Sequence, residues 1–193
     1  RRPSLFDSVL SSDFLDPPPP LIDLVSTLSK QIDDAEYFEQ VLDILRRWAN
    51  ERKFQIGLQS LRGVISPPDA AWALSDTAEA ALQCLFPAVE AEFAAQHGRI
   101  PGARFCAIAL GKLGGHEMTP TSDLDLVFIY DIPPDTDASD GEKPLPPTQY
   151  FARLGQRYIN AIMSPTAEGI LYEVDMRLRP SGNAGPIACT LEA

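Results

Sequence analysis

Two aspartates at the start of an apolar run are the residues of this chain best suited to chemistry. Residues 122–126 read Ser-Asp-Leu-Asp-Leu. Because side chains alternate along a strand, Asp123 and Asp125 point to one side and the two leucines point into the core. Carboxylates this close repel each other unless a cation lies between them, and a hard divalent ion such as Mg²⁺ prefers oxygen ligands of this kind. The motif therefore predicts a magnesium site at Asp123 and Asp125.

A glycine-containing turn precedes the aspartates and reads Gly-Lys-Leu-Gly-Gly at positions 111–115. Glycines let another group approach the backbone closely, so the N–H groups of Gly114 and Gly115 can face a phosphate. Lys112 would add a positive charge there, and Ser122 a hydroxyl donor. The turn therefore predicts a phosphate-binding site next to the magnesium site.

The segment 171–178 repeats the alternation later in the chain. It predicts a third strand with one charged and one apolar face, which is covered on one side only. The charged face carries Asp175, which an adjacent strand would bring beside the first two aspartates as a third metal ligand. The same face carries Arg177 and Arg179, which could neutralise charge that develops on a phosphate. The three aspartates are the predicted catalytic residues.

Each of these parts also has a purely structural interpretation. An Asp-x-Asp pair at a strand end is often only a solvated edge, and a Gly-Gly pair is often only a turn. Arg177 and Arg179 could pair with Glu173 and Asp175 on an exposed sheet face. The order of the parts, namely a glycine turn, then Ser-Asp-x-Asp, then an acid on a later charged strand, favours the functional interpretation.

The elements that must position these residues change type near residue 100. Before it, apolar residues recur at helical spacing between capping residues and prolines, and after it short apolar runs indicate strands. We therefore predict an α+β fold, with a helical region 1–100 that leads into a catalytic core 101–193. Helices are expected at 5–15, 21–32, from Asp33 or Asp34 to Gly63, 70–96 with a kink near Pro87, and 148–163; strands are expected at 105–110, 124–130 and 171–178.

The predicted environment of individual residues follows from the same patterns. The long helix that ends near Gly63 has an apolar face that includes Trp48, and Trp72 is likewise expected in a helix core or contact. The strand at 105–110 is apolar throughout and is expected to be buried. The acidic, proline-rich segment 131–147 is expected to be a solvated loop. His97 and His116 have no ligand spacing and are expected at the surface.

Composition excludes several classes of function. The chain has 16 Lys+Arg against 27 Asp+Glu, a formal net charge of −11, and no basic cluster, so neither nucleic acid nor an anionic membrane is expected as a partner. Three widely spaced cysteines without a zinc spacing indicate a reduced, cytoplasmic protein. No transmembrane helix and no secretory signal are expected. The chain lacks a starting Met and a closing signal, and we expect it to be a fragment of a larger protein.

Two long stretches carry a family resemblance: GKLGGHEMTPTSDLDLVFIYD and YFARLGQRYINAIMSPTAEGILYEVDMRLRPSGNAGP. The order of parts resembles the polymerase-beta-like nucleotidyltransferase superfamily, and the stretches resemble the glutamine synthetase adenylyltransferases within it. They cover most of residues 104–188, and residues 2–15 resemble the segment before the second catalytic domain of that family. The resemblance implies a mixed nucleotidyltransferase sheet with flanking helices, here truncated at its C-terminal end.

The family enzyme is bifunctional, with one domain that removes AMP from glutamine synthetase by phosphorolysis and a second that attaches AMP from ATP. Residues 172–175 and 179–183 are more similar to the attaching domain, since the removing domain tends to have a basic residue where Glu173 stands. The resemblance therefore implies Mg²⁺-dependent transfer of AMP from ATP to a tyrosine hydroxyl of glutamine synthetase. Asp123 and Asp125 would hold two magnesium ions, and Asp175 would complete the acceptor-side metal and help the tyrosine lose its proton.

The resemblance also implies partners and leaves alternatives open. Glutamine synthetase would be the protein substrate, and a nitrogen-signalling regulatory protein would act through the full-length enzyme. The AMP-removing half-reaction would need the same three carboxylates. A degenerate module on the same fold that senses a nucleotide without transferring it is a further alternative.

Overall fold

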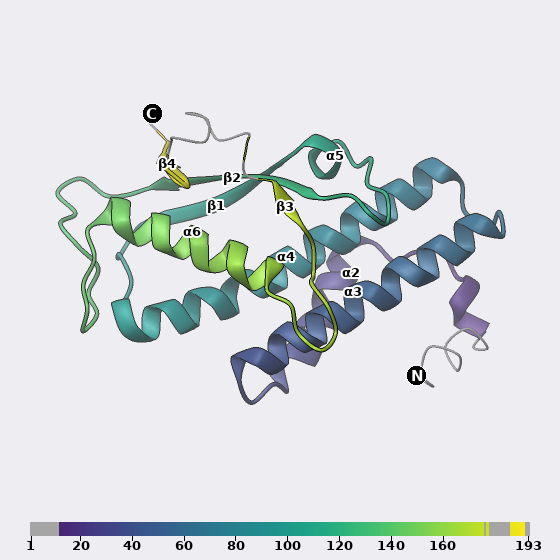
Figure 1. The fold of residues 1–193 in the computed structure, drawn as a ribbon, viewed down its shortest axis with the longest axis horizontal. Helices are drawn as coiled ribbons and strands as arrows, with labels where there is room; N and C mark the ends of the chain where they lie inside the picture. The colour runs from purple at the N-terminus through teal and green to yellow at the C-terminus, as the bar shows by residue number, and fades with distance from the viewer. Residues whose placement is uncertain (1–11, 176, 178–185, 192–193) are drawn as a thin grey trace.

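Long helices on one side of a mixed sheet make up the architecture (Figure 1). The computed structural model describes residues 12–175, 177 and 186–191. In chain order the elements are a 3₁₀ turn η1 (Ser12–Leu15), α2 (Leu21–Asp33), α3 (Phe38–Leu61), α4 (Pro67–His97), β1 (Arg104–Leu110), α5 (Gly111–Gly114), β2 (Leu124–Asp131), α6 (Pro147–Met163), β3 (Val174–Asp175) and β4 (Ala188–Thr190). The predicted α+β class is confirmed.

The helix boundaries follow capping and proline signals, with one error. The Ser66 side chain accepts a hydrogen bond from the Asp69 N–H at 3.3 Å, and prolines occupy the first turn of α4. The predicted cap of α3 at Asp33 or Asp34 is wrong, because Asp33 ends α2 and Asp34 is its C-cap. A turn is needed before the chain can reverse, so α3 begins only at Phe38. Most of the helix predicted at 5–15 lies outside the described residues.

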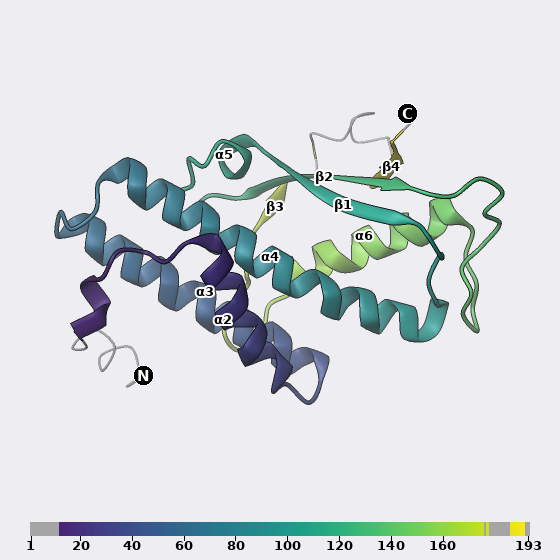
Figure 2. The same cartoon turned by 180° about the vertical axis from the view of Figure 1, so that it is seen from behind.

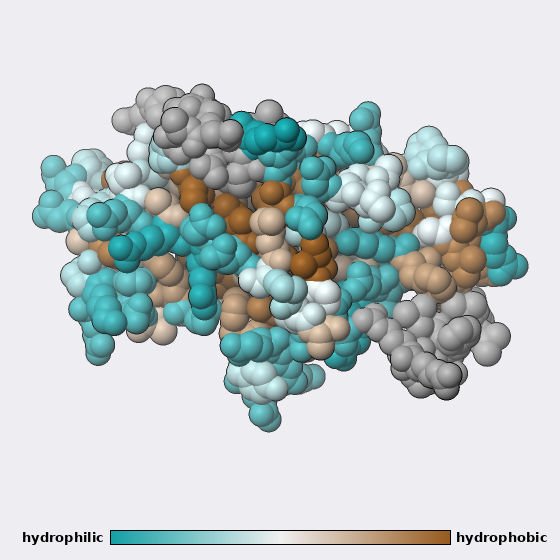
Figure 3. Space-filling model, in the orientation of Figure 1, coloured by the Kyte–Doolittle hydropathy of each residue, from teal (hydrophilic) through white to brown (hydrophobic). Residues whose placement is uncertain are grey.

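Helices α2, α3 and α4 pack together beneath the sheet, and Figure 2 shows α2 from the side on which it crosses the other two. The predicted apolar face of α3 is confirmed, since Val41, Leu45 and Trp48 are buried. The expected position of Trp72 in a helix core or contact is wrong. Its surface is 56% exposed, and its ring stacks on His116 instead of entering a core. Leu61 and Val64 are also exposed, at the end where α3 turns into α4 and where Figure 3 shows apolar side chains on the surface.

The sheet is mixed, with β2 at its centre. Strand β1 pairs antiparallel with β2, whereas β3 and β4 each pair parallel with a different part of β2. The predicted burial of β1 is wrong, because Cys106, Ala107 and Ile108 are exposed. Within the described part of the chain β1 has one partner strand, and the helices cover one sheet face, so an unbroken apolar run here marks a half-covered edge strand.

Helix α6 forms as predicted, with its apolar face buried through Phe151, Leu154 and Tyr158. Strand β3 is shorter than predicted: within the described residues it comprises Val174 and Asp175, and residues 176 and 178 lie outside them. Leu171 and Tyr172 are both buried, which alternation along one strand would not allow. The chain is therefore approaching the sheet at 171–173 and enters it only at Val174.

The loop 131–147 is not simply solvated as predicted, because it docks on the end of α4. Ser139 and Leu145 are buried, and the Arg99 N–H donates to the Asp140 carboxylate at 2.6 Å. His97 is only 8% exposed and its Nδ1 lies 2.8 Å from the Lys143 carbonyl oxygen, so its expected surface position is also wrong. Backbone polar groups at a helix end need partners, and the loop supplies them.

Two further observations concern the chain as a whole. Cys84, Cys106 and Cys189 are free. In the part of the chain that the structure describes, no helix is both long and apolar enough to cross a membrane. One apolar core runs from Leu24 in α2 to Ala188 in β4, and the domain division at residue 100 stays a prediction.

Candidate functional site

Asp125 and Asp175 meet where β2 pairs with β3. The two residues are register partners in the parallel ladder, and the Leu124 N–H donates to the Glu173 carbonyl oxygen at 2.9 Å just before them. Asp123 directly precedes β2 and is exposed. Leu124 and Leu126 are fully buried on the helix side of the sheet, so the aspartates lie on the face that the helices leave open. The structure thus brings the three predicted carboxylates together at one end of two strands.

Asp125 is the acid of the three whose affinity for protons is raised. The pKa of Asp125 is raised, first by burial and then by the negative charges of Asp123 and Asp175, while Arg177 and Lys112 oppose the shift. The negative charges around Asp125 are not fully balanced by Arg177 and Lys112, and a bound cation would reduce the repulsion between the carboxylates. The donor chemistry therefore fits a hard divalent ion.

Asp175 is engaged by a residue two positions further along. The Arg177 backbone N–H donates to Asp175 Oδ1 at 2.8 Å, its Nε donates to Oδ2 at 2.7 Å, and its Nη2 lies 2.5 Å from Oδ2. These bonds hold the pKa of Asp175 below its usual range. The structural interpretation of Arg177 as an ion-pair partner is thus correct for this state of the site. Arg179 lies outside the described residues.

The three aspartates do not form a ready-made metal cluster. Among residues 12–175, 177 and 186–191, no three His, Cys, Asp or Glu side chains are grouped closely enough to hold a metal ion. Both carboxylate oxygens of Asp175 accept hydrogen bonds from Arg177. The chemistry of the acids fits Mg²⁺, and the metal assignment of Asp123, Asp125 and Asp175 stays a prediction.

The glycine turn is a single helical turn, α5, at the end of β1. The Gly115 N–H donates to the Gly111 carbonyl oxygen at 3.0 Å and is used within the turn. A Cβ on Gly114 would lie 2.5 Å from the Ala109 carbonyl oxygen, so packing against β1 explains this glycine. The predicted contact of Gly114, Gly115 and Lys112 with phosphate stays a prediction.

Gly111 is a site residue for which the sequence reasoning proposed no role. Its φ is +53°, and a Cβ at this position would overlap the Asp125 carboxylate, with Asp125 Cγ only 2.9 Å away. Glycine is the residue that adopts this backbone conformation readily and leaves room for the acid. The signal in the sequence was the glycine directly after an apolar strand.

Ser122 fixes the turn that delivers Asp123. Its hydroxyl is buried, accepts the Thr119 N–H at 2.9 Å, and shares a hydrogen bond with the Thr119 hydroxyl at 2.9 Å. These bonds between Thr119 and Ser122 fix the conformation of the turn, and therefore the point at which the chain reaches Asp123. The predicted contact of Ser122 with phosphate remains untested.

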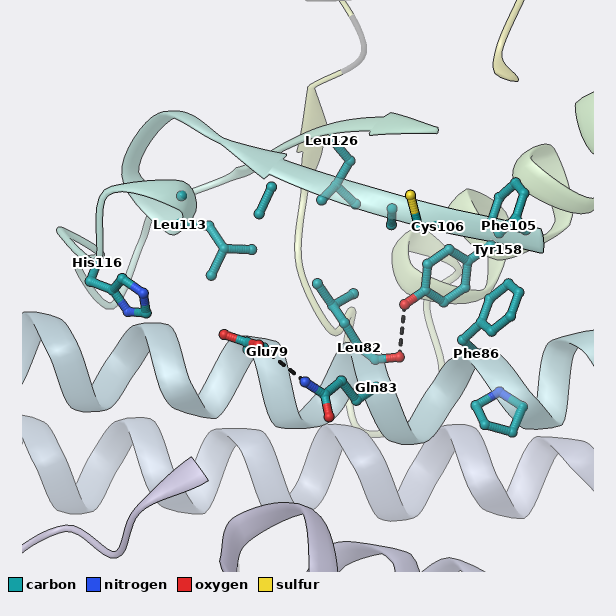
Figure 4. Close-up of a pocket in the computed structure, with 14 residues that line it drawn as sticks. Glu79, Leu82, Gln83, Phe86, Phe105, Cys106, Leu113, His116, Leu126 and Tyr158 are labelled. Carbon is teal, nitrogen blue, oxygen red and sulfur yellow. Dashed lines mark hydrogen bonds between the residues drawn. The ribbon is translucent and has the colours of Figure 1, made fainter. Parts of the chain in front are cut away.

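Helix α4 supports the glycine turn from below through an aromatic pair. The ring of His116, directly after Gly115, stacks on Trp72 with 4.1 Å between centroids and 10° between planes. Beside this pair a cavity of about 620 Å³ lies between β1 and α4, lined by apolar side chains that include Phe86, Phe105 and Leu113 (Figure 4). None of the three aspartates is among its described lining residues, so it is separate from the carboxylate site.

The fold and site together define a class of protein: an α+β nucleotidyltransferase-like domain, in which acids at adjoining strand ends face the open side of a mixed sheet. The family model described as Glutamate-ammonia ligase adenylyltransferase matches residues 1–193, and the chain belongs to this family. The family resemblance inferred from the motifs is therefore confirmed.

Curated relatives agree with that membership. The chain is 46% identical over 193 residues to a protein of Mesorhizobium japonicum and 48% identical over 193 residues to one of Brucella suis. It is 44% identical over 192 residues to one of Rhizobium meliloti. Each is named bifunctional glutamine synthetase adenylyltransferase/adenylyl-removing enzyme, and each match covers 100% of this chain. The chain spans about a fifth of the length of these relatives, 20% in each case.

Proposed function

We propose that this chain is the nucleotidyltransferase part of an enzyme that transfers AMP from ATP to a tyrosine hydroxyl of glutamine synthetase. One observation carries the proposal: Asp125 and Asp175 are register partners on the open face of the sheet, with Asp123 two residues from Asp125. Family membership and the names of the relatives support it.

In the proposed reaction the tyrosine oxygen forms a bond to the α-phosphorus of ATP. The bond from that phosphorus to the oxygen that bridges to the β-phosphorus breaks, and pyrophosphate leaves. Mg²⁺, held by Asp123 and Asp125 with Asp175 as the third ligand, would supply charge neutralisation and a lowered pKa of the tyrosine hydroxyl. Asp175 is the acid assigned to the proton that the tyrosine releases.

The basic residues have separate proposed roles. Arg177 is largely exposed and carries a positive charge beside the acids, so it can exchange Asp175 for a phosphate oxygen when a nucleotide arrives. Lys112 is exposed on the glycine turn and acts on Asp125 electrostatically, which suits a contact with the triphosphate. Arg179 is assigned the same task as Arg177.

The same acids would serve the AMP-removing half-reaction, which is the second candidate. The similarity of residues 172–175 and 179–183 to the attaching domain favours attachment. A nucleotide-sensing module without transfer is less favoured, because all three acids and the glycine turn are present. A nitrogen-signalling regulatory protein as a partner of the full-length enzyme, and a cytoplasmic location, belong to the same proposal.

The test is transfer of label from α-labelled ATP to purified glutamine synthetase by the full-length enzyme. We expect labelled glutamine synthetase with Mg²⁺ and none with a chelator. The Asp125→Asn variant should abolish labelling, which assigns the activity to this site within a bifunctional protein. Retained labelling in that variant, together with loss of ADP production from adenylylated glutamine synthetase and phosphate, would assign removal to this site. Mg²⁺-dependent ATP binding without either reaction would favour the sensing module.

A further inference from the structure

Helix α3 carries a row of polar side chains that donate hydrogen bonds to the connection between α6 and β3. Arg46, Asn50 and Lys53 follow one another at spacings of four and three residues, so they share one face of the helix. Each donates to backbone carbonyl oxygens of the segment 161–171. Figure 1 shows this connection reaching down from α6 to α3 before it rises into β3.

Arg46 is the most deeply buried member of the row, with 0% of its surface exposed. Its Nη2 donates to the Ala161 carbonyl at 2.9 Å and to the Ser164 carbonyl at 2.5 Å, and its Nε donates to the Gly169 carbonyl at 2.9 Å. Ala161 belongs to the last turn of α6, where carbonyl groups lack helical partners and the helix dipole is negative. A guanidinium is suited to this place because its charge persists when it is buried and its donors fan out in one plane.

Lys53 contacts the last part of the connection before the strand. Its Nζ donates to the Leu171 carbonyl at 3.2 Å and lies 3.6 Å from the centroid of the Tyr172 ring, which is buried. Between the two, Asn50 Nδ2 donates to the Glu168 carbonyl at 3.3 Å. Both contacts of Lys53 are made within four residues of Asp175, so little chain separates this anchor from the third carboxylate.

The connection also has bonds within itself and to α6, but these do not attach it to α3. Thr166 and Gly169 bond each other's backbone, and the Leu171 N–H donates to the Ile162 carbonyl at 3.2 Å. On the sheet side, the described residues of the strand are Val174 and Asp175, which are joined to β2. Two paired residues by themselves give a weak register, so we expect contacts on the approach to contribute to it.

We propose that Arg46 and Lys53 are positioning residues, which hold the 164–172 connection on α3 so that Asp175 enters the sheet opposite Asp125. The consequence for AMP transfer rests on the proposed function, whereas the placement of β3 does not. The helical half thereby controls the geometry of the carboxylate site through two residues of α3 that contact the connection. A shift of α3 along its axis would move the third carboxylate relative to the other two.

Hydrogen–deuterium exchange of the full-length protein tests the placement. In Lys53→Met we expect exchange in peptides that cover 168–175 to increase about tenfold or more, since a charge-assisted hydrogen bond and a cation–π contact are lost. Exchange in 104–110 should stay unchanged. Lys53→Arg should restore the wild-type pattern, and Arg62→Met, the same charge change on an exposed residue at the end of α3, should have no effect. Unchanged exchange at 168–175, or an equal increase in both regions, would overturn the proposal.

A second measurement separates positioning from stability alone. In the labelling assay, Lys53→Met should raise the Mg²⁺ concentration needed for half-maximal transfer and lower kcat, with KM for glutamine synthetase unchanged. Arg46→Lys, which keeps the charge but loses the planar set of donors, should act in the same direction. A variant with faster exchange at 168–175 but an unaltered Mg²⁺ requirement and kcat would overturn the link to the site. If the wild-type protein transfers no AMP, the proposed function fails, and the exchange comparison still decides whether α3 orders β3.

Discussion

Asp125 and Asp175 stand opposite each other in the parallel pairing of β2 with β3, although fifty residues of chain separate them. Asp123 adds a third negative charge from the turn before β2, and the pKa of Asp125 rises in response to both neighbours and to its burial. Acids are costly to gather in this way for the fold alone. A bound cation would offset this repulsion, and the magnesium assignment stays a prediction.

Asp125→Asn should separate function from stability. Because the raised pKa means that the charge of Asp125 opposes folding at neutral pH, removal of the charge should leave the melting temperature equal or slightly higher. AMP transfer by the full-length enzyme should fall by about a hundredfold or more. Thermal melts and the labelling assay measure the two effects. Near-normal transfer would show that Asp125 is not a metal ligand.

Gly111→Ala should damage the site through the backbone. Its positive φ disfavours a side chain, and the new Cβ would overlap the Asp125 carboxylate, so we expect a loss of about 1–2 kcal/mol in the free energy of unfolding. Gly57→Ala is the matched control, since it lies inside α3 with nothing within 4 Å of the added Cβ. That change should stabilise by about 0.5–1 kcal/mol. Urea unfolding measures the free energy of unfolding of both variants. Equal changes in the two variants would contradict the role assigned to Gly111.

Arg177→Gln should increase the affinity of the site for a divalent cation in the absence of nucleotide. The substitution releases the Asp175 carboxylate from its ion pair and removes a positive charge from beside Asp125. We expect Mn²⁺ to bind several-fold more tightly, as measured by electron paramagnetic resonance titration of the full-length protein. Arg104→Gln is the control, because Arg104 makes a comparable ion pair with Asp131 at the other end of β2 and is equally exposed. If both variants bind Mn²⁺ like the wild type, Arg177 does not restrain the third carboxylate.

The stability of the chain should depend on Lys53 at alkaline pH. Burial lowers the pKa of Lys53 to about 8 from about 10.5. Between these two values the unfolded chain binds more protons than the folded chain, so this residue makes the free energy of unfolding increase as the pH rises through that range. Lys53→Met should lack the increase, whereas Lys30→Met, an exposed lysine on α2, should keep it. Urea unfolding at pH 7 and pH 9.5 compares the three proteins, and parallel behaviour of all three would contradict the assignment.

Local patterns were sufficient to predict most elements and the parts of the site. The apolar face of α3, the Ser66 cap of α4 and the strand that follows Asp123 and carries Asp125 are properties of neighbouring residues in sequence. The position of Asp175 beside them was also predictable, since its segment has the same alternation and the family resemblance supplies the order of the parts. Periodicity and capping act within a few residues, and a sequence displays them directly.

Contacts between distant residues were decided only in the tertiary structure. The sequence could not show that β1 is a half-covered edge, that Trp72 meets His116, or that the acidic loop docks on α4, because each depends on which surfaces the fold leaves open. The ion pair between Asp175 and Arg177 depends on how the chain turns at Arg177, just after the residues that pair with β2. The row on α3 reads in sequence as an ordinary polar stripe. It becomes an anchor for the third carboxylate only because folding brings carbonyl groups more than a hundred residues away against it.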